Sequence, residues 1–233
     1  AGGTLLFALH PVQVETVAWA SGAKDLLCGL LSLLAVYQYV QFARLSRSPD
    51  AAPEAEDLAA RARQRRRLLT AHVSGAFLLI LAMLSKPSAM VVPPVVAAID
   101  LFVIGRAWRK VARSAGGWLL VVVPFAVVAR ISQDAALLPH IPLWQRPSIA
   151  SDAIAFYLWK LVWPARLTFD YSWRPVELVR EPWFYAAAAA TVVVAAALWV
   201  GRKQWRGVAV GGLVFVVGLL PTLGLMKYEF MFF

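Results

Sequence analysis

The chain has 233 residues, of which 61% are hydrophobic and only 15% are charged, and its formal net charge is +10. A soluble domain has roughly 25% charged residues, so this composition excludes an ordinary soluble globule. The basic residues fall in short connections between apolar runs, which is typical of the inner-side loops of membrane proteins and not of a nucleic-acid-binding surface. We therefore expect an all-α integral membrane protein without a nucleic-acid partner.

Apolar runs, taken in chain order, predict the membrane crossings, because a helix of about 20 residues crosses about 30 Å of hydrocarbon. The chain begins inside such a run, so residues 1–9 are interpreted as the end of a truncated first span, and we expect a fragment of a longer protein. Pro93 and Pro94 are expected to kink the third complete span, since proline removes a helix hydrogen bond. The complete spans, about six in number, are predicted at 26–43, 68–85, 88–105, 115–131, 183–200 and 207–226.

Three basic connections, at 44–67, 106–113 and 202–206, fall on one side of the membrane when the crossings are counted. The positive-inside rule makes that side the cytoplasm, so residues 44–67 are predicted to form a cytoplasmic basic loop that is helical near its end. Residues 132–182 then form an extracytoplasmic loop. Within it, residues 151–163 are predicted to form an interfacial helix, because about 13 residues span only roughly 20 Å.

Four ionisable residues gather near the start of the chain on the predicted outer side: His10, Glu15, Lys24 and Asp25. Charged groups at a membrane boundary are costly and often functional, so this cluster is a candidate site for an anionic head group or for orienting an acceptor. The alternative is a set of side chains that snorkel to water, with Glu15 and Lys24 paired for structure. Nothing nearby completes a ligand set around His10 and Glu15, so no metal site is predicted.

Five further polar residues are candidates of a weaker kind. Lys86 lies at an outer turn, where its ammonium would either clamp a phosphate or simply snorkel to water. Asp100 is expected to pair with a nearby arginine. Arg130 suits the dipole of a helix end, and His140 and Arg146 either line an acceptor groove or belong to an ordinary Pro-rich loop.

Aromatic residues surround Asp170 in the stretch L-V-W-P-A-R-L-T-F-D-Y-S-W at 161–173, with Tyr171 directly following it. Aromatic rings stack on sugars and a carboxylate accepts hydrogen bonds from their hydroxyls, so the stretch is typical of sugar binding and equally of an interfacial aromatic belt. The sequence has no Gly-rich phosphate loop, nucleophile elbow, zinc motif or kinase signature, so a soluble nucleotide-using enzyme is not supported.

Four stretches together resemble a known family. The first, F-A-L-H-P-V-Q-V-E-T-V-A-W-A-S-G-A-K-D-L-L at 7–27, looks like the H-P-x-x-x-E-x-V-A segment of the transmembrane, tetratricopeptide-repeat-containing O-mannosyltransferases and their bacterial relatives. The others agree in the same order: L-S-K-P-S-A-M-V-V-P-P at 84–94, W-P-A-R-L-T-F-D-Y-S-W at 163–173 and G-L-L-P-T-L-G-L at 218–225. The resemblance covers nearly the whole chain, and its first and third motifs are the more specific ones.

The resemblance implies the GT-C fold of multi-spanning membrane glycosyltransferases, so that residues 1–233 would form a partial GT-C-like transmembrane domain. It implies a polyprenyl-phosphate-linked sugar as donor, with mannose favoured, and a protein hydroxyl as acceptor, at the periplasmic face of a bacterial inner membrane. The metal requirement stays open. The catalytic acid of such enzymes typically lies in the first outer loop, which would precede Ala1, and the tetratricopeptide repeats of the family are absent here. Ala23 stands where an arginine is common in relatives.

The leading hypothesis from these observations is the core of a membrane glycosyltransferase, and the alternative is a non-catalytic membrane scaffold or lipid-handling module. A transporter ranks last, because the predicted spans are mostly Ala, Val, Leu and Gly. The general base is not identified, with Glu15 and Asp25 as its candidates. The residues predicted to contact donor, sugar or acceptor, or to orient those that do, are His10, Glu15, Lys24, Asp25, Lys86, Asp170 and Tyr171.

Overall fold

The chain is all-α wherever a computed structural model describes it, as the sequence predicts. The described residues are 2–18, 22–47, 58–131, 142, 145–165, 167, 182–220 and 223. Within these residues, five helical stretches are long and apolar enough to cross a membrane, and they overlap the first five predicted complete spans, so the chain is an integral membrane protein. These stretches are Ala23–Arg47, Ala59–Ser85, Pro87–Ile104, Trp108–Val128 and Phe184–Lys203.

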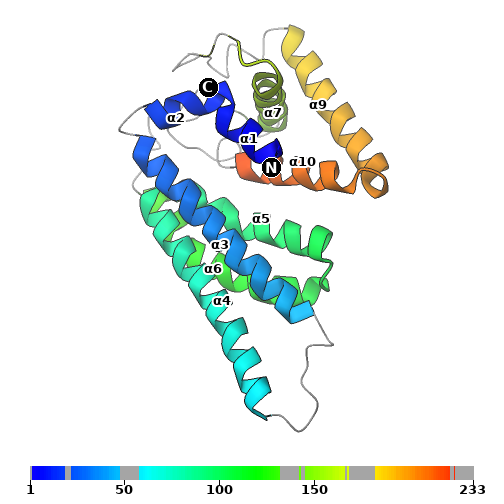
Figure 1. Cartoon of the computed structure of the whole chain (residues 1–233). Coiled ribbons are helices and arrows are strands. Elements are labelled where there is room, and N and C mark those ends of the chain that lie inside the picture. Colours follow the sequence, from blue (N-terminus) through cyan, green and yellow to red (C-terminus); the bar gives the residue numbers. More distant parts are fainter. Residues whose placement is uncertain are drawn as a thin grey trace. The chain divides into compact units, whose positions relative to one another are not determined.

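The chain divides into two compact units (Figure 1). Unit 1 joins Ala1–Ala20 to Ile131–Phe233, and unit 2 is Ser21–Arg130. The helices of unit 2 are α3 (Ala23–Arg47), α4 (Leu58–Ser85), the 3₁₀ segment η4 (Pro87–Val91), α5 (Val92–Ile99), the π-helical segment η5 (Asp100–Ile104) and α6 (Trp108–Ile131).

Unit 2 is built on the packing of α3 against α4, which lie side by side in Figure 1. Small residues such as Ala35 and Gly75 let the backbones come close, as is usual where helices associate in lipid. Trp118 of α6 fills the space over Gly75 and is only 1% exposed. The opposite helix faces carry exposed apolar side chains such as Leu33 and Leu120, which is the surface that lipid would cover.

The third candidate span changes its helix type twice. Pro93 and Pro94 occupy the first turn of α5, where the missing N–H of a proline leaves no carbonyl unpaired. The kink expected at these prolines takes the form of a change from 3₁₀ to α geometry at the start of α5. The α-helix then widens into η5 and ends at Gly105, whose φ of 77° lies in the left-handed region that favours glycine. The Gly105 N–H donates to the Asp100 carbonyl, 2.7 Å away.

Two of the predicted basic connections are more helical than expected. The prediction of a loop at 106–113 is wrong for most of its length, because α6 begins at Trp108. The segment 44–67 is helical at both ends, since α3 continues to Arg47 and α4 begins at Leu58. Lysine and arginine are good helix formers, which explains why a basic run continues a helix beyond the apolar part.

Unit 1 contains α1 (Gly2–Leu9), the 3₁₀ segment η1 (Pro11–Gln13), α2 (Val14–Ala18), α7 (Arg146–Val162), α9 (Pro182–Val200), the 3₁₀ segment η7 (Gly201–Lys203) and α10 (Arg206–Leu219). The predicted interfacial helix corresponds to α7, which begins five residues earlier than expected and packs against α9. The Thr191 hydroxyl of α9 donates to the Ser151 carbonyl of α7, 2.9 Å away. The predicted span 207–226 is represented by the 14-residue α10, and most of its remainder lies outside the described residues.

Candidate functional site

Asp25 and Lys86 form an ion pair at the end of unit 2 where α3 begins and α4 ends. Asp25 lies in the first turn of α3, where a carboxylate suits the positive end of the helix dipole. Lys86 is extended between α4 and η4, with φ of −156° and ψ of 128°. The side chains of Lys86 and Asp25 are 43% and 31% exposed, so a ligand can reach both.

The backbone around Lys86 is held by several hydrogen bonds. Its N–H donates to the Ala82 carbonyl at 2.9 Å, and its carbonyl accepts from the Ala89 N–H at 3.2 Å. The Cys28 thiol of α3 also donates to that carbonyl, at 3.7 Å. The Lys86 backbone is therefore held in a defined turn. The exposed Lys24 lies in the first turn of α3, next to Asp25 in sequence, and adds a second cation to this end of unit 2. Such an arrangement can bind an anion such as a phosphate.

His10 has a structural role in unit 1. Its Nδ1 accepts a hydrogen bond from the Val12 N–H at 3.2 Å, which caps η1. Its Nε2 lies 2.9 Å from the Leu161 carbonyl oxygen near the end of α7 and donates to it, since Nδ1 already accepts. Nδ1 is thus used in the local cap of η1, and Nε2 joins the start of the chain to α7.

The remaining predicted site residues are only partly described. Glu15 lies in α2, but its side chain is outside the described part of the chain, as is that of Arg130. Asp170, Tyr171 and His140 are outside the described residues altogether. The structure therefore brings together Lys86 and Asp25 from the predicted set, with Lys24 beside them in sequence.

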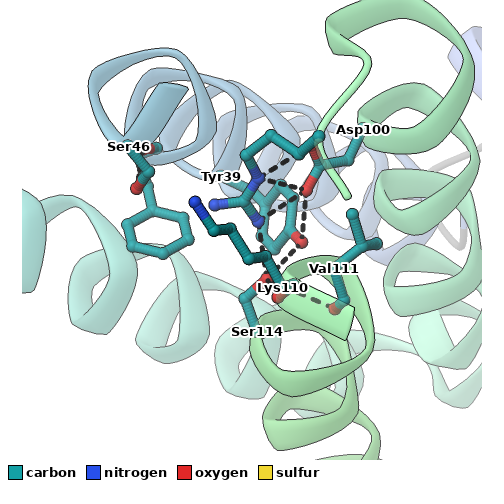
Figure 2. A network of polar contacts seen from close by, with 8 residues as sticks. Tyr39, Ser46, Asp100, Lys110, Val111 and Ser114 are labelled. Atoms are coloured by element: carbon teal, nitrogen blue, oxygen red, sulfur yellow. Dashed lines mark hydrogen bonds and ion pairs between the residues drawn. The ribbon is translucent and has the colours of Figure 1, made fainter. Parts of the chain in front are cut away.

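A second polar cluster lies inside unit 2 (Figure 2). Arg106 binds the Asp100 carboxylate through Nε, 3.0 Å from each carboxylate oxygen, and through Nη2, 2.6 Å from Oδ2. Tyr39 donates to Asp100 Oδ2 at 3.0 Å, and its hydroxyl lies 2.9 Å from Ser114 Oγ. Arg106 Nη2 also donates to Ser114 Oγ at 2.7 Å. The expectation that Asp100 pairs with a nearby arginine is confirmed.

The local fold explains how residues six positions apart can pair. The turn at Gly105 reverses the backbone, and the N–H groups of Gly105 and Arg106 both point at the Asp100 carbonyl, at 2.7 and 3.3 Å. The Arg106 side chain then lies over the Phe42 ring, 5.1 Å from its centroid. The side chains of Arg106 and Asp100 are 4% and 0% exposed, so the two opposite charges are paired with each other in a buried site. We interpret this cluster as a clamp that joins α3, η5 and α6.

An aromatic group continues from this clamp toward α4. His72 lies 4.6 Å from Phe42 and 5.7 Å from Trp118 between ring centroids, and Tyr39 lies 5.1 Å from Trp118. His72 Nδ1 and Trp118 Nε1 are buried and make no hydrogen bond within the described part of the chain. No sequence pattern points to these residues or to Tyr39 and Ser114, because their partners come from different helices. The histidine inside the apolar run of α4, His72, is a sequence feature that could have pointed to this aromatic group.

Asp152 on α7 is a third acidic position, and it is not among the candidates predicted from the sequence. It is 4% exposed in unit 1, and this burial raises the pKa of its carboxyl from 3.8 to about 6. No group of three His, Cys, Asp or Glu side chains that could hold a metal ion occurs among the described residues.

Comparison with known proteins gives no match to a family model, to a curated protein or to a solved structure. The structure shows an integral membrane protein. Unit 2 carries an accessible Asp25–Lys86 pair at one end and the buried clamp around Asp100 and Arg106 toward the other.

Proposed function

We propose that the chain is the membrane core of a glycosyltransferase of GT-C type. It would move a sugar, with mannose favoured, from a polyprenyl-phosphate donor to a protein hydroxyl at the periplasmic face of a bacterial inner membrane. The observation that carries the proposal is the accessible ammonium of Lys86, which pairs with Asp25, the residue that follows the exposed Lys24 in α3. The resemblance of residues 7–27 to the O-mannosyltransferase segment supports the same proposal.

The reaction would be a displacement at the anomeric carbon of the donor. The acceptor oxygen forms a bond to that carbon as a carboxylate takes its proton, and the bond to the phosphate oxygen breaks with its electron pair leaving on the phosphate. Lys24 and Lys86 would stabilise the negative charge that grows on this phosphate. Because Asp25 is engaged by Lys86, we assign it the positioning of that ammonium. The general base is not assigned, and Glu15 is the other candidate that the sequence offers.

Incubation of the full-length protein in liposomes with radiolabelled polyprenyl-phosphate mannose and a Ser- and Thr-containing peptide tests the proposal. Label that enters the peptide and is released by alkali, as an O-linked sugar is, would support it. Binding of the donor without any transfer would favour the non-catalytic lipid-handling module, and the absence of both binding and transfer would contradict both.

A further inference from the structure

Basic side chains from three helices collect at the end of unit 2 that lies away from the Asp25–Lys86 pair. We call this the arginine-rich end. α3 finishes toward this end, while α4 and α6 begin toward it, and Figure 1 shows the first turns of α4 extending beyond the end of α3. Its residues are exposed in the structure: Arg47 of α3, the arginines at 61, 63, 65, 66 and 67 of α4, and Arg109, Lys110 and Arg113 of α6.

The length of α4 places its arginines at the depth of lipid headgroups. α4 has 28 residues, which corresponds to about 42 Å, whereas the hydrocarbon layer is about 30 Å thick. Its apolar part, residues 68–85, covers about 27 Å of that layer. The first turns, residues 58–67, therefore extend beyond the hydrocarbon, and they carry five arginines.

The start of α6 marks the same interface independently. Trp108 is 67% exposed, and the Arg109 guanidinium lies 5.6 Å from the centroid of its ring. Exposed tryptophan next to a cation at a helix start is typical of the boundary between hydrocarbon and headgroups. Lys110 and Arg113 follow on the same two turns, so α6 adds its charges to the arginine-rich end.

Hydrogen bonds join the end of α3 to η5 and to the start of α6. Tyr39 and Ser114 connect α3 to α6, and the Arg47 guanidinium donates to the Ile104 carbonyl at the end of η5. The cations of α3 and α6 are thus presented by helix ends that are already joined, which lowers the entropy lost on binding a ligand. α4 packs along α3. Within the described part of unit 2, the acids are Asp25, at the opposite end, and Asp100, which is buried and paired with Arg106.

The overall charge of this end is positive even when every nearby acid is counted. The sequence places four acids in residues 48–57, which are outside the described part of the chain. The seven arginines of 44–67 outnumber them, and residues 106–113 add three exposed cations besides Arg106, whose charge is paired with Asp100. An anionic partner at headgroup depth therefore meets a net positive surface.

We propose that the arginine-rich end of unit 2 binds the phosphate groups of anionic phospholipids. Guanidinium groups form paired hydrogen bonds to phosphate, and clusters of basic residues next to a membrane span attract anionic leaflets. This surface is separate from the Asp25–Lys86 pair, so lipid binding here does not depend on whether the protein has transferase activity.

The test uses the full chain in nanodiscs that contain equal amounts of phosphatidylglycerol and phosphatidylcholine, with the lipids retained by the extracted protein counted by mass spectrometry. We expect phosphatidylglycerol to be enriched by about twofold or more at low salt and the enrichment to fall as sodium chloride is added. The combined Arg61→Gln, Arg65→Gln and Arg66→Gln variant should lose most of it. The control variant Arg202→Gln, Lys203→Gln and Arg206→Gln removes the same charge from unit 1 and should keep it.

Three results would overturn the proposal: no enrichment in the unsubstituted protein, enrichment that salt does not change, or equal losses in the test and control variants. Lysine at positions 61, 65 and 66 should restore most of the enrichment, which separates lost charge from lost folding; failure to do so would also contradict the proposal. Inorganic phosphate is compared with chloride at equal ionic strength. Stronger displacement by phosphate would identify a free-phosphate site instead of a headgroup surface.

Discussion

Lys86 pairs with Asp25 across 61 positions of sequence, at the point where α4 ends and α3 begins. An ion pair as exposed as this one contributes about 0–1 kcal/mol to stability. The pair therefore matters chiefly for position, because it holds an ammonium at an accessible end of unit 2. The pair between Asp100 and Arg106 is its opposite: buried, bidentate and shared with two hydroxyls.

Replacing Asp100 by Asn should destabilise the protein by about 3 kcal/mol, because the Arg106 charge would stay buried without its partner. Asp25→Asn is the matched control and should cost less than about 1 kcal/mol. Thermal unfolding in one detergent compares the two. The double variant Asp100→Leu with Arg106→Leu should recover much of the loss. Equal effects of the two single substitutions would contradict the role assigned to the buried pair.

Removing the Tyr39 hydroxyl should weaken the clamp without changing the packing of the ring. Tyr39→Phe removes the hydrogen bond to Asp100 and the contact with Ser114, and we expect the free energy of unfolding to fall by about 1–2 kcal/mol. Tyr37, which is 58% exposed on the same helix, provides the control Tyr37→Phe, expected to be nearly neutral. The free energies of unfolding of the two variants should differ clearly, and their coincidence would argue against a stabilising clamp.

Gly75 should not tolerate even a methyl group. A Cβ at this position would lie 2.7 Å from the Trp118 ring, which is buried between Tyr39 and His72 and has no room to move. We expect Gly75→Ala to cost about 1–3 kcal/mol from overpacking. Gly29→Ala, whose Cβ would meet nothing within 4 Å, should instead be neutral or stabilising, since alanine favours helices. A Gly75→Ala variant as stable as Gly29→Ala would show that α4 and α6 are farther apart.

Asp152 should make the stability of unit 1 depend on pH. Burial raises the pKa of this carboxyl from 3.8 to about 6, so between these values the folded state keeps a proton that the unfolded state releases. Stability is therefore highest below about pH 4 and falls as the pH rises through 6, by about 3 kcal/mol in all. Unfolding measured from pH 4 to 8 should show this slope in the unsubstituted protein and in Asp25→Asn, and should lose it in Asp152→Asn. If Asp152→Asn leaves the pH dependence of stability unchanged, that dependence arises from another group and the prediction is contradicted.

The helical class and the first five complete spans could be predicted because the length of an apolar run is a local property of the sequence. Counting the crossings also placed Asp25 and Lys86 on the same side, and their contact agrees with that placement within unit 2. The expected pairing of Asp100 followed from its place near a basic segment, because a carboxylate inside an apolar run needs a cation.

The clamp as a whole could not be predicted, for two physical reasons. Arg106 reaches Asp100 only because η5 and the left-handed Gly105 turn the backbone around, and neither feature has a distinct sequence pattern. Tyr39 and Ser114 meet through the packing of separate helices, which the periodicity of a single helix does not reveal. His10 shows a related difficulty: its position next to Pro11 was compatible with ligand binding, whereas its ring is used to cap η1 and bind α7.

The most direct measurement of the central claim is transfer of radiolabelled mannose from polyprenyl phosphate to peptide by the full-length protein and its Lys86→Met variant. Lys203→Met, at an exposed lysine of unit 1, is the control. If Lys86 binds the leaving phosphate, Lys86→Met should lower transfer by at least about tenfold while Lys203→Met stays near the unsubstituted rate, with equal amounts of folded protein in each assay. Full transfer by Lys86→Met would contradict the account by removing this ammonium from the reaction.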